Sequence, residues 1–72
     1  MEVWVLEKYY PEGNMDIINV FDNPEAAMYS IKLLHADIVW TKYTSYCVGS
    51  NVDDEIYYYL TKFQVILDEV PN

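Results

Sequence analysis

The sequence predicts an α+β domain in which one helix packs on one face of a small antiparallel sheet, in the order β-β-α-β-β. Three observations lead to this fold class. Two β-prone segments flank a turn at the start of the chain, a capped helical segment follows, and two further segments have strand composition. With 72 residues, the chain is long enough for a single domain, residues 1–72, with a thin core.

The first two strands are predicted over residues 2–10, EVWVLEKYY, and residues 15–21, MDIINVF. Both segments are rich in β-branched and aromatic residues, which favour strands. Residues 11–14, PEGN, combine Pro, Gly and Asn, and this combination is typical of a turn. We therefore expect residues 2–21 to form a β-hairpin.

The helix is predicted over residues 22–37. Its first residues favour this start, because Asn23 suits the N-cap, Pro24 suits the first helical position and Glu25 lies in the positive first turn. Apolar residues then recur at helical spacing and should form the buried stripe. The expected stripe consists of Ala27, Ile31, Leu34 and Ile38.

The second half of the chain has a less regular pattern. Residues 38–48 have strand composition, and residues 49–54 are typical of a turn. Residues 55–67, EIYYYLTKFQVIL, are rich in tyrosine and β-branched residues, which favour a strand, so we predict a second hairpin. A helix is the alternative for this last segment. Its apolar stripe would contain Ile56, Tyr59, Leu60, Phe63 and Ile66 or Leu67.

Both faces of the predicted sheet are apolar, and one helix can cover only one of them. The opposite face therefore needs a cover. A second subunit, a protein partner or a ligand would each supply it. Strict alternation predicts that Trp4 shares a face with Leu6, Val3 with Val5, Ile17 with Phe21, and Ile18 with Val20.

The charge balance is strongly acidic. Twelve acids, four lysines and no arginine give a net charge of −8. Basic side chains supply most of the affinity of proteins for nucleic acids, and Arg is best shaped for phosphate. The balance therefore argues against direct binding to DNA, RNA or an anionic membrane, and it fits a basic partner. The alternative is that the acids only keep a small apolar protein in solution.

Neither a catalytic site nor a metal site is predicted, and no cofactor is expected. Cys47 and His35 are the single residues of their kinds, and no ligand pair has the spacing of a zinc finger. A lone cysteine in an apolar strand is usually an inert buried thiol. The acidic runs at residues 53–55 and 68–69 are typical of solvated loop ends. We therefore expect that the protein is not an enzyme.

No apolar run approaches the roughly 20 residues that a membrane-spanning helix needs. The N-terminal MEVWVLEK has an acid at position 2 and strand-like residues after it, so it does not resemble a signal peptide. We expect a cytosolic chain that is complete from its initiator Met.

Aromatic residues make up 17% of the chain, and Tyr and Trp are enriched in the cores of protein interfaces. On a strand, Tyr57 and Tyr59 face one side and Tyr58 faces the other, so their burial should differ. We expect Tyr57 and Tyr59, with Trp40 and Tyr46 from the neighbouring strand, to form a patch on the uncovered face. The alternative is that these rings only close a small core.

Four segments resemble a family of short, functionally uncharacterised proteins and domains of phages, prophages and bacterial genomes. They are VWVLEKYY, IINVF, the helix start DNPEAAMYSI, and the closing LDE at residues 67–69. The resemblance spans residues 3–34 and 63–69, whereas residues 38–58 depart from the family pattern. It implies a phage-type setting and an α+β fold, and it carries over no catalytic residue.

The leading functional hypothesis is a small acidic protein–protein interaction module, encoded by a phage or prophage, that inhibits a host defence or nucleic-acid-handling protein with a basic surface. One alternative is a homodimerising structural domain joined through the uncovered face. Another is a protein that sequesters a small ligand or nucleotide by stacking on its aromatic rings. The expected partner-binding residues are Asp53, Asp54, Glu55, Asp68 and Glu69 as an electrostatic rim, with Tyr57 and Tyr59 as anchors.

Overall fold

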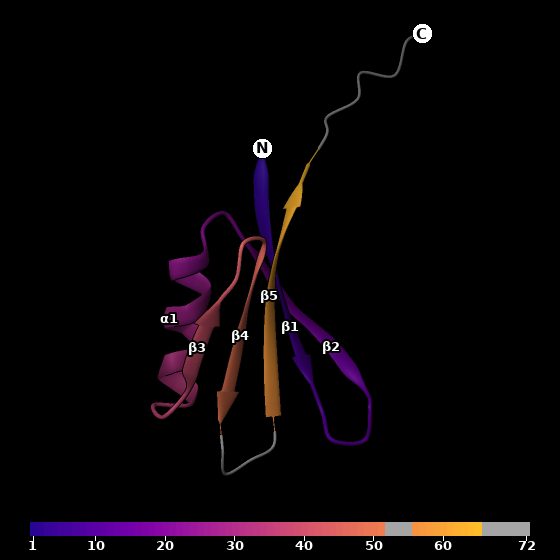
Figure 1. Ribbon diagram of the computed structural model, residues 1–72, viewed down its shortest axis with the longest axis vertical. Coiled ribbons are helices and arrows are strands. Elements are labelled where there is room, and N and C mark those ends of the chain that lie inside the picture. Colours follow the sequence, from indigo (N-terminus) through magenta and orange to yellow (C-terminus); the bar gives the residue numbers. More distant parts are fainter. Residues whose placement is uncertain (52–55, 66–72) are drawn as a thin grey trace, which may run out of the picture.

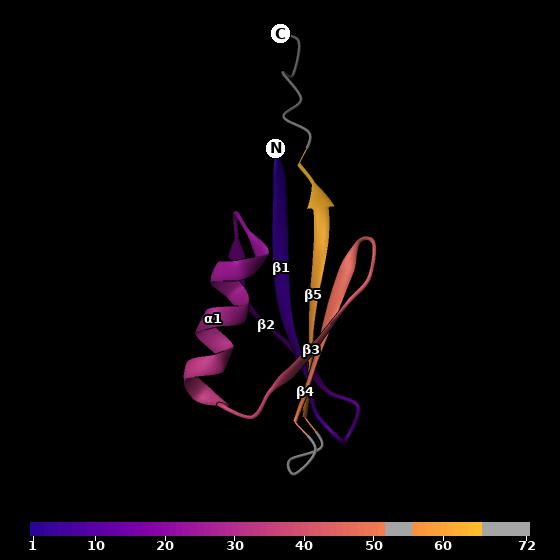
Figure 2. The ribbon, with the colours of Figure 1, turned by 60° about the vertical axis from the view of Figure 1, so that its left-hand side comes forward.

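The computed structural model describes residues 1–51 and 56–65, which form one five-stranded antiparallel sheet and one helix (Figure 1). The strand order across the sheet is β2-β1-β5-β4-β3, and the helix lies against one face (Figure 2). The predicted α+β class is therefore confirmed. The elements are β1 (Glu2–Tyr9), β2 (Met15–Phe21), α1 (Pro24–Leu34), β3 (Val39–Lys42), β4 (Tyr46–Asn51) and β5 (Ile56–Gln64).

The N-terminal hairpin forms as predicted, with β1 antiparallel to β2. In the turn, the Tyr10 N–H donates to the carbonyl of Asn14, and the Gly13 N–H donates to the carbonyl of Tyr10, each at 3.0 Å. Gly13 has a φ of +94°, a conformation that glycine adopts without the steric cost of a Cβ. The turn residues therefore fix the end of the hairpin locally.

A β-bulge interrupts the hairpin between Leu6 and Glu7 of β1. An extra residue in one strand changes the face on which the following side chains lie. Phe21 pairs with Trp4, whereas Ile17 pairs with Glu7. The prediction that Ile17 and Phe21 share a face is therefore wrong, because strict alternation assumes an uninterrupted ladder.

The helix begins as predicted. Asn23 is the N-cap, and its Oδ1 accepts a hydrogen bond from the Ala26 N–H at 2.8 Å. Pro24 is the first helical residue and Glu25 lies in the first turn. These contacts satisfy one of the N–H groups that every helix start leaves without an intrahelical partner.

The buried stripe of the helix is shorter than predicted. Ala27 and Ile31 are buried, but Leu34 is 72% exposed, so its predicted place in the core is wrong. The helix ends at Leu34, and the chain then turns at His35, whose carbonyl accepts a hydrogen bond from the Ile38 N–H at 3.1 Å. This turn brings Ile38, instead of Leu34, into the core.

Residues 38–48, predicted as one strand, contain a strand break. β3 and β4 form a hairpin in which the Tyr43 N–H donates to the carbonyl of Tyr46 at 2.8 Å. Gly49, predicted to lie in a turn, lies inside β4. A Cβ at this position would come within 2.9 Å of the Trp40 ring, so glycine is required here by packing rather than by a turn.

The last segment is a strand, as predicted, and not a helix. β5 pairs with β1 on one side and with β4 on the other, so it is the central strand of the sheet. Its run of tyrosine and β-branched residues suits this position. In the described residues, no helix is long and apolar enough to cross a membrane.

The core lies between α1 and the face of the sheet turned toward it, here called the covered face. Each of its residues is at most 6% exposed, and no polar or charged side chain of the described residues is buried with them. Figure 2 shows that the helix stands on this side of the sheet only. The core consists of Leu6, Ala27, Ile31, Ile38, Cys47, Tyr58 and Leu60.

Candidate functional site

The candidate site is the face of the sheet turned away from α1, here called the open face. Because side chains alternate along a strand, the cross-strand register assigns each residue to one of the two faces. Three rows of neighbours cross the open face, and a further pair lies at one end. The rows are Val20, Val5, Thr61 and Tyr46; Ile17, Glu7, Tyr59, Val48 and Thr41; and Met15, Tyr9, Tyr57, Ser50 and Val39; the end pair is Val3 and Phe63.

Large apolar side chains on the open face are strongly exposed. The exposed fraction is 65% for Ile17, 48% for Tyr57 and 49% for Phe63. These residues come from different strands, but the register places them on one continuous surface. Monomeric soluble proteins rarely expose contiguous apolar patches larger than a few hundred Å², and larger patches usually mark interaction sites.

The aromatic rings of the open face contact one another. Tyr9 and Tyr59 form an edge-to-face pair with their centroids 4.9 Å apart and their planes at 70°. The Tyr9 hydroxyl also donates to Glu7 Oε2 at 3.4 Å. Partial burial and the Glu7 charge raise the pKa of Tyr9. These contacts hold the middle of the face in a defined arrangement.

A second aromatic pair lies at the β3–β4 end of the face. Tyr43 follows β3 and stacks on Tyr46 of β4, with centroids 4.6 Å apart and an interplanar angle of 14°. Both rings are exposed. The predicted place of Tyr46 on the uncovered side of the sheet is therefore confirmed, and Tyr43 is an addition that the prediction did not contain.

The open face is almost without charge. Among the described strand residues that lie on it, Glu7 is the only ionisable acid or base apart from tyrosine. Lys8, Lys42 and Lys62 belong to the covered side of the sheet by register. Lys62 Nζ lies 3.9 Å from Glu2 Oε1 near the end of that side. The open face is thus suited to apolar and aromatic contacts rather than to ion pairs.

The three consecutive tyrosines of β5 separate as predicted. Tyr57 and Tyr59 lie on the open face, whereas Tyr58 is 2% exposed and belongs to the core. The Tyr58 hydroxyl shares a hydrogen bond with His35 Nε2 at 3.0 Å. The predicted rim acids, residues 53–55 and 68–69, lie outside the described residues, so their role in binding stays a prediction.

Trp40 does not join the tyrosines on the open face. It pairs with Gly49, whose neighbour in β5 is the buried Tyr58, and its ring packs against the core on the covered face. The prediction that Trp40 joins the patch is therefore wrong. The single long strand assumed for residues 38–48 placed Trp40 by composition alone, and the β3–β4 turn gives it a different register.

The cysteine and the histidine have structural surroundings. Cys47 is buried, and burial raises the pKa of its thiol, which disfavours the thiolate that a nucleophile or a metal ligand requires. His35 contacts Tyr58 through both the hydrogen bond and its ring, with centroids 5.7 Å apart. In the described part of the chain, no cluster of three His, Cys, Asp or Glu side chains could hold a metal ion.

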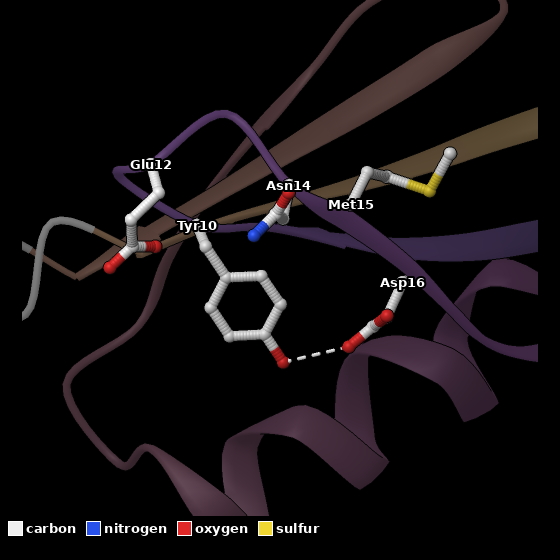
Figure 3. Close-up of a pocket in the computed structure, with 5 residues that line it drawn as sticks. All are labelled: Tyr10, Glu12, Asn14, Met15 and Asp16. Atoms are coloured by element: carbon white, nitrogen blue, oxygen red, sulfur yellow. Dashed lines mark hydrogen bonds between the residues drawn. The ribbon is translucent and has the colours of Figure 1, made fainter.

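A hollow of about 550 Å³ lies beside the β1–β2 turn (Figure 3). The Tyr10 hydroxyl donates to Asp16 Oδ2 at 3.0 Å, and this bond raises the pKa of Tyr10. Lys8 Nζ lies 5.0 Å from the Tyr10 ring centroid. The sequence predicted this region only as a turn. The lining residues are Tyr10, Glu12, Asn14, Met15 and Asp16.

Exposed apolar residues also occur on α1, where no patch was predicted. Tyr29 and Leu33 are four residues apart and are 66% and 70% exposed. Residues at this spacing lie on one side of a helix, and here that side points away from Ala27 and Ile31. The predicted buried stripe of the helix did not identify this exposed apolar surface.

Comparison of the chain with protein family models, curated proteins and solved structures found no match.

Proposed function

We propose that the protein is a small acidic interaction module, encoded by a phage or prophage, that binds a host protein through the open face and inhibits it in the host cytoplasm. The observation that carries this proposal is the continuous apolar and aromatic surface opposite the helix. Tyr57 and Phe63 are each about half exposed there, whereas Leu6, Tyr58 and Leu60 on the covered face are almost completely buried.

The charge of the chain supports the choice of partner. A net charge of −8 without arginine accelerates encounter with a basic surface and repels nucleic acids and acidic membranes. The open face itself has little charge, so attraction must come from acids around it. We assign this role to the acidic runs at residues 53–55 and 68–69, and the partner class to host proteins that handle nucleic acids or act in defence.

Binding is favoured over catalysis by the state of the reactive groups. The Cys47 thiol is buried with a raised pKa, and the hydroxyl of Tyr58 is engaged with His35. By contrast, tyrosines at the surface, such as Tyr57 and Tyr46, provide large contact areas at low entropic cost together with a polar group at the ring end. Such residues commonly anchor interfaces.

The experiment is affinity capture from a lysate of a bacterial host, followed by measurement of the affinity for the recovered protein. The double change Tyr57→Ser and Phe63→Ser should weaken binding at least tenfold, since it removes two exposed rings from the open face. The matched control is Tyr29→Ser together with Leu33→Ser, which removes two exposed apolar side chains from α1 and should leave binding within twofold. Equal loss in both double variants would contradict the proposal.

The charge part of the proposal has its own test. Neutralising the five rim acids as Asp53→Asn, Asp54→Asn, Glu55→Gln, Asp68→Asn and Glu69→Gln should slow association and reduce its dependence on salt. Neutralising Asp22, Glu25 and Asp37 is the control for total charge. If the two sets change the association rate equally per charge, the rim has no special role.

Self-association through the open face is a second candidate, favoured by the near absence of charge on that surface. Five strands at about 4.8 Å spacing and about seven residues in length give roughly 550 Å² of flat area. Two copies face to face would therefore bury roughly 1,100 Å², close to the lower limit for a specific interface. Sedimentation of the purified protein tests this second candidate. A monomer at micromolar concentration excludes it. A dimer that dissociates when Tyr57→Ser and Phe63→Ser are introduced favours it.

A further inference from the structure

The sheet has two edges, and they differ in protection. β3 is four residues long and carries Lys42 at its end, and short charged edges discourage pairing with other strands. β2 is seven residues long and contains neither lysine nor proline. All its residues from Met15 to Val20 are exposed, and among residues 1–51 and 56–65 no strand pairs with its outer side (Figure 1). The edge formed by β2 is therefore the more accessible one.

The hydrogen-bonding direction of β2 follows from the ladder. In an antiparallel pair, a residue directs both its N–H and its C=O to the same side. The Tyr10 N–H bonds to the carbonyl of Asn14 across the hairpin, whereas the Val65 N–H bonds to the carbonyl of Met1. Even-numbered residues of β1 therefore bond to β2, and odd-numbered ones bond to β5. In β2, the residues opposite odd-numbered positions direct their backbone groups outward: Met15, Ile17 and Val20.

The two ends of this edge are not equivalent. The Val20 N–H is already engaged locally, since it donates to Asn19 Oδ1 at 2.8 Å. The bulge then separates Val20 from Ile17. The continuous stretch from Met15 to Ile17 therefore offers the regular part of the edge, with two N–H groups and two carbonyls directed away from the sheet.

The side chains around this stretch define what it would accept. On the open face, Met15 and Ile17 present apolar side chains that are 42% and 65% exposed. On the other face, Asp16 and Glu12 line the hollow beside the turn (Figure 3). Asp16 Oδ2 accepts from Tyr10, which leaves further acceptor capacity on the same carboxylate. Lys8 pairs with Asp16 across the hairpin on the same face, so the two carboxylates leave one excess negative charge there. An added strand would thus meet apolar contacts on one face and a net acidic surface on the other.

We propose that the β2 edge at Met15–Ile17 binds an extended segment of the partner protein in which apolar residues alternate with lysine or arginine. Main-chain hydrogen bonds to Met15 and Ile17 would extend the sheet by one strand. The apolar side chains of the segment would stand beside Met15 and Ile17 on the open side of the sheet, and its basic side chain would enter the acidic hollow. This inference rests on the proposed function and adds the kind of segment that the partner supplies.

Charge complementarity distinguishes this occupant from a second copy. β2 has the sequence MDIINVF, so the same strand of another molecule brings an acid and no cation to the hollow. The bulge also breaks the regular ladder that two long edges need. A short segment with one basic residue between two apolar ones avoids both problems.

The test is selection from a display library of random seven-residue peptides on the full-length protein. Enriched sequences should alternate β-branched or aromatic residues with Lys or Arg and lack proline at the centre. Ile17→Pro removes the outward N–H without removing a bond to β1, and it should weaken binding at least tenfold. Ile17→Ala is the matched control, because it removes the same side chain but keeps the N–H, and it should cost no more than about threefold.

Two further changes test the remaining parts. N-methylation of the enriched peptide on the residues facing β2 should abolish binding, whereas N-methylation of the alternate residues should not. Asp16→Asn with Glu12→Gln should weaken Lys-containing peptides about threefold and leave a Lys→Ala peptide unchanged. An empty selection, enrichment of acidic peptides, or equal effects of Ile17→Pro and Ile17→Ala would each overturn the proposal. Filaments of the protein alone that Ile17→Pro abolishes would assign the edge to a second copy instead.

This test is separate from that of the proposed function. The peptides should bind with unchanged affinity to the Tyr57→Ser and Phe63→Ser variant, because those residues lie on the other side of β1 from β2. If the peptides bind but no captured host protein depends on the open face, the proposed function is rejected and the edge proposal stands. If a host protein binds through the open face and Ile17→Pro does not weaken that binding, the edge proposal is rejected and the proposed function stands.

Discussion

The two faces of the sheet are built from the same five strands, yet their apolar side chains differ in exposure to solvent. On the covered face, Leu6, Tyr58 and Leu60 are almost completely buried beneath α1. On the open face, Tyr57 and Phe63 from the same strand as Leu60 remain about half exposed. Both faces are apolar, so hydrophobicity alone does not distinguish residues that stabilise the fold from residues available to a partner.

This difference separates stability from binding along single strands. In β5, successive tyrosines alternate between the core and the surface, because the side-chain period of a strand is two residues. Substitutions at neighbouring positions should therefore have opposite consequences. Changes on the covered face should unfold the domain, and changes on the open face should leave it folded but unable to bind.

The largest expected effect is on the covered face. Leu60→Ala should lower the free energy of unfolding by about 3 kcal/mol, because Leu60 is fully buried between β1 and β4. Phe63→Ala, on the open face of the same strand, should cost less than about 1 kcal/mol. Urea denaturation of the two variants measures both values. Similar losses in the two would erase the distinction between the faces.

The next effect concerns the close approach of β3 to β4 on the covered face. Gly49→Ala places a Cβ 2.9 Å from the Trp40 ring and from Ile38 Cδ1, and should cost about 2 kcal/mol by overpacking. The control is Ser50→Ala, one residue further and on the open face, which should change stability by less than about 0.5 kcal/mol. A neutral Gly49→Ala in the same denaturation assay would show that Trp40 has room to move.

The smallest effect is a dependence of stability on alkaline pH. Burial raises the pKa of Cys47 above its ordinary value of 9.0, so the folded state holds the thiol proton more tightly than the unfolded state. The resulting stability is complete below pH 9 and is lost as the pH rises through the folded-state pKa. Cys47→Ala should flatten the fall of the urea midpoint above pH 9.

The control for this pH profile is Val48→Ala, which changes the adjacent side chain on the open face and introduces no titrating group. It should keep the alkaline slope of the parent protein. Tyr9 and Tyr10 also have a raised pKa, so part of the slope should persist above pH 10 in both variants. A slope unchanged by Cys47→Ala would contradict the buried, protonated state of this thiol.

Local signals in the sequence were sufficient for the hairpin, the start of the helix and the alternation within β5. The turn residues 11–14 and the Asn23 cap act through hydrogen bonds to their near neighbours, so their effect can be predicted without the rest of the fold. Because side chains alternate along a strand, a buried Tyr58 places Tyr57 and Tyr59 on the opposite face.

Other features depend on contacts between distant residues. Gly49 is typical of a turn by composition, and only its position against Trp40 explains why it lies in a strand. Leu34 fits a helical stripe, but the turn at His35 brings Ile38 into the core in its place. The bulge that separates Ile17 from Phe21 lies where two apolar residues, Ile17 and Ile18, are adjacent, and strict alternation did not predict it. The β2 edge and its acidic hollow escaped prediction for the same reason.

The most direct test of the central claim is hydroxyl-radical footprinting of the aromatic residues, with and without the captured host protein, at a concentration where the free protein is monomeric. In the free protein, Tyr57, Phe63 and Tyr29 should react and Tyr58 should be protected. Binding should protect Tyr57 and Phe63 and leave Tyr29 reactive. Protection of Tyr29 with no change at Tyr57 and Phe63 would show that the open face is not the binding surface.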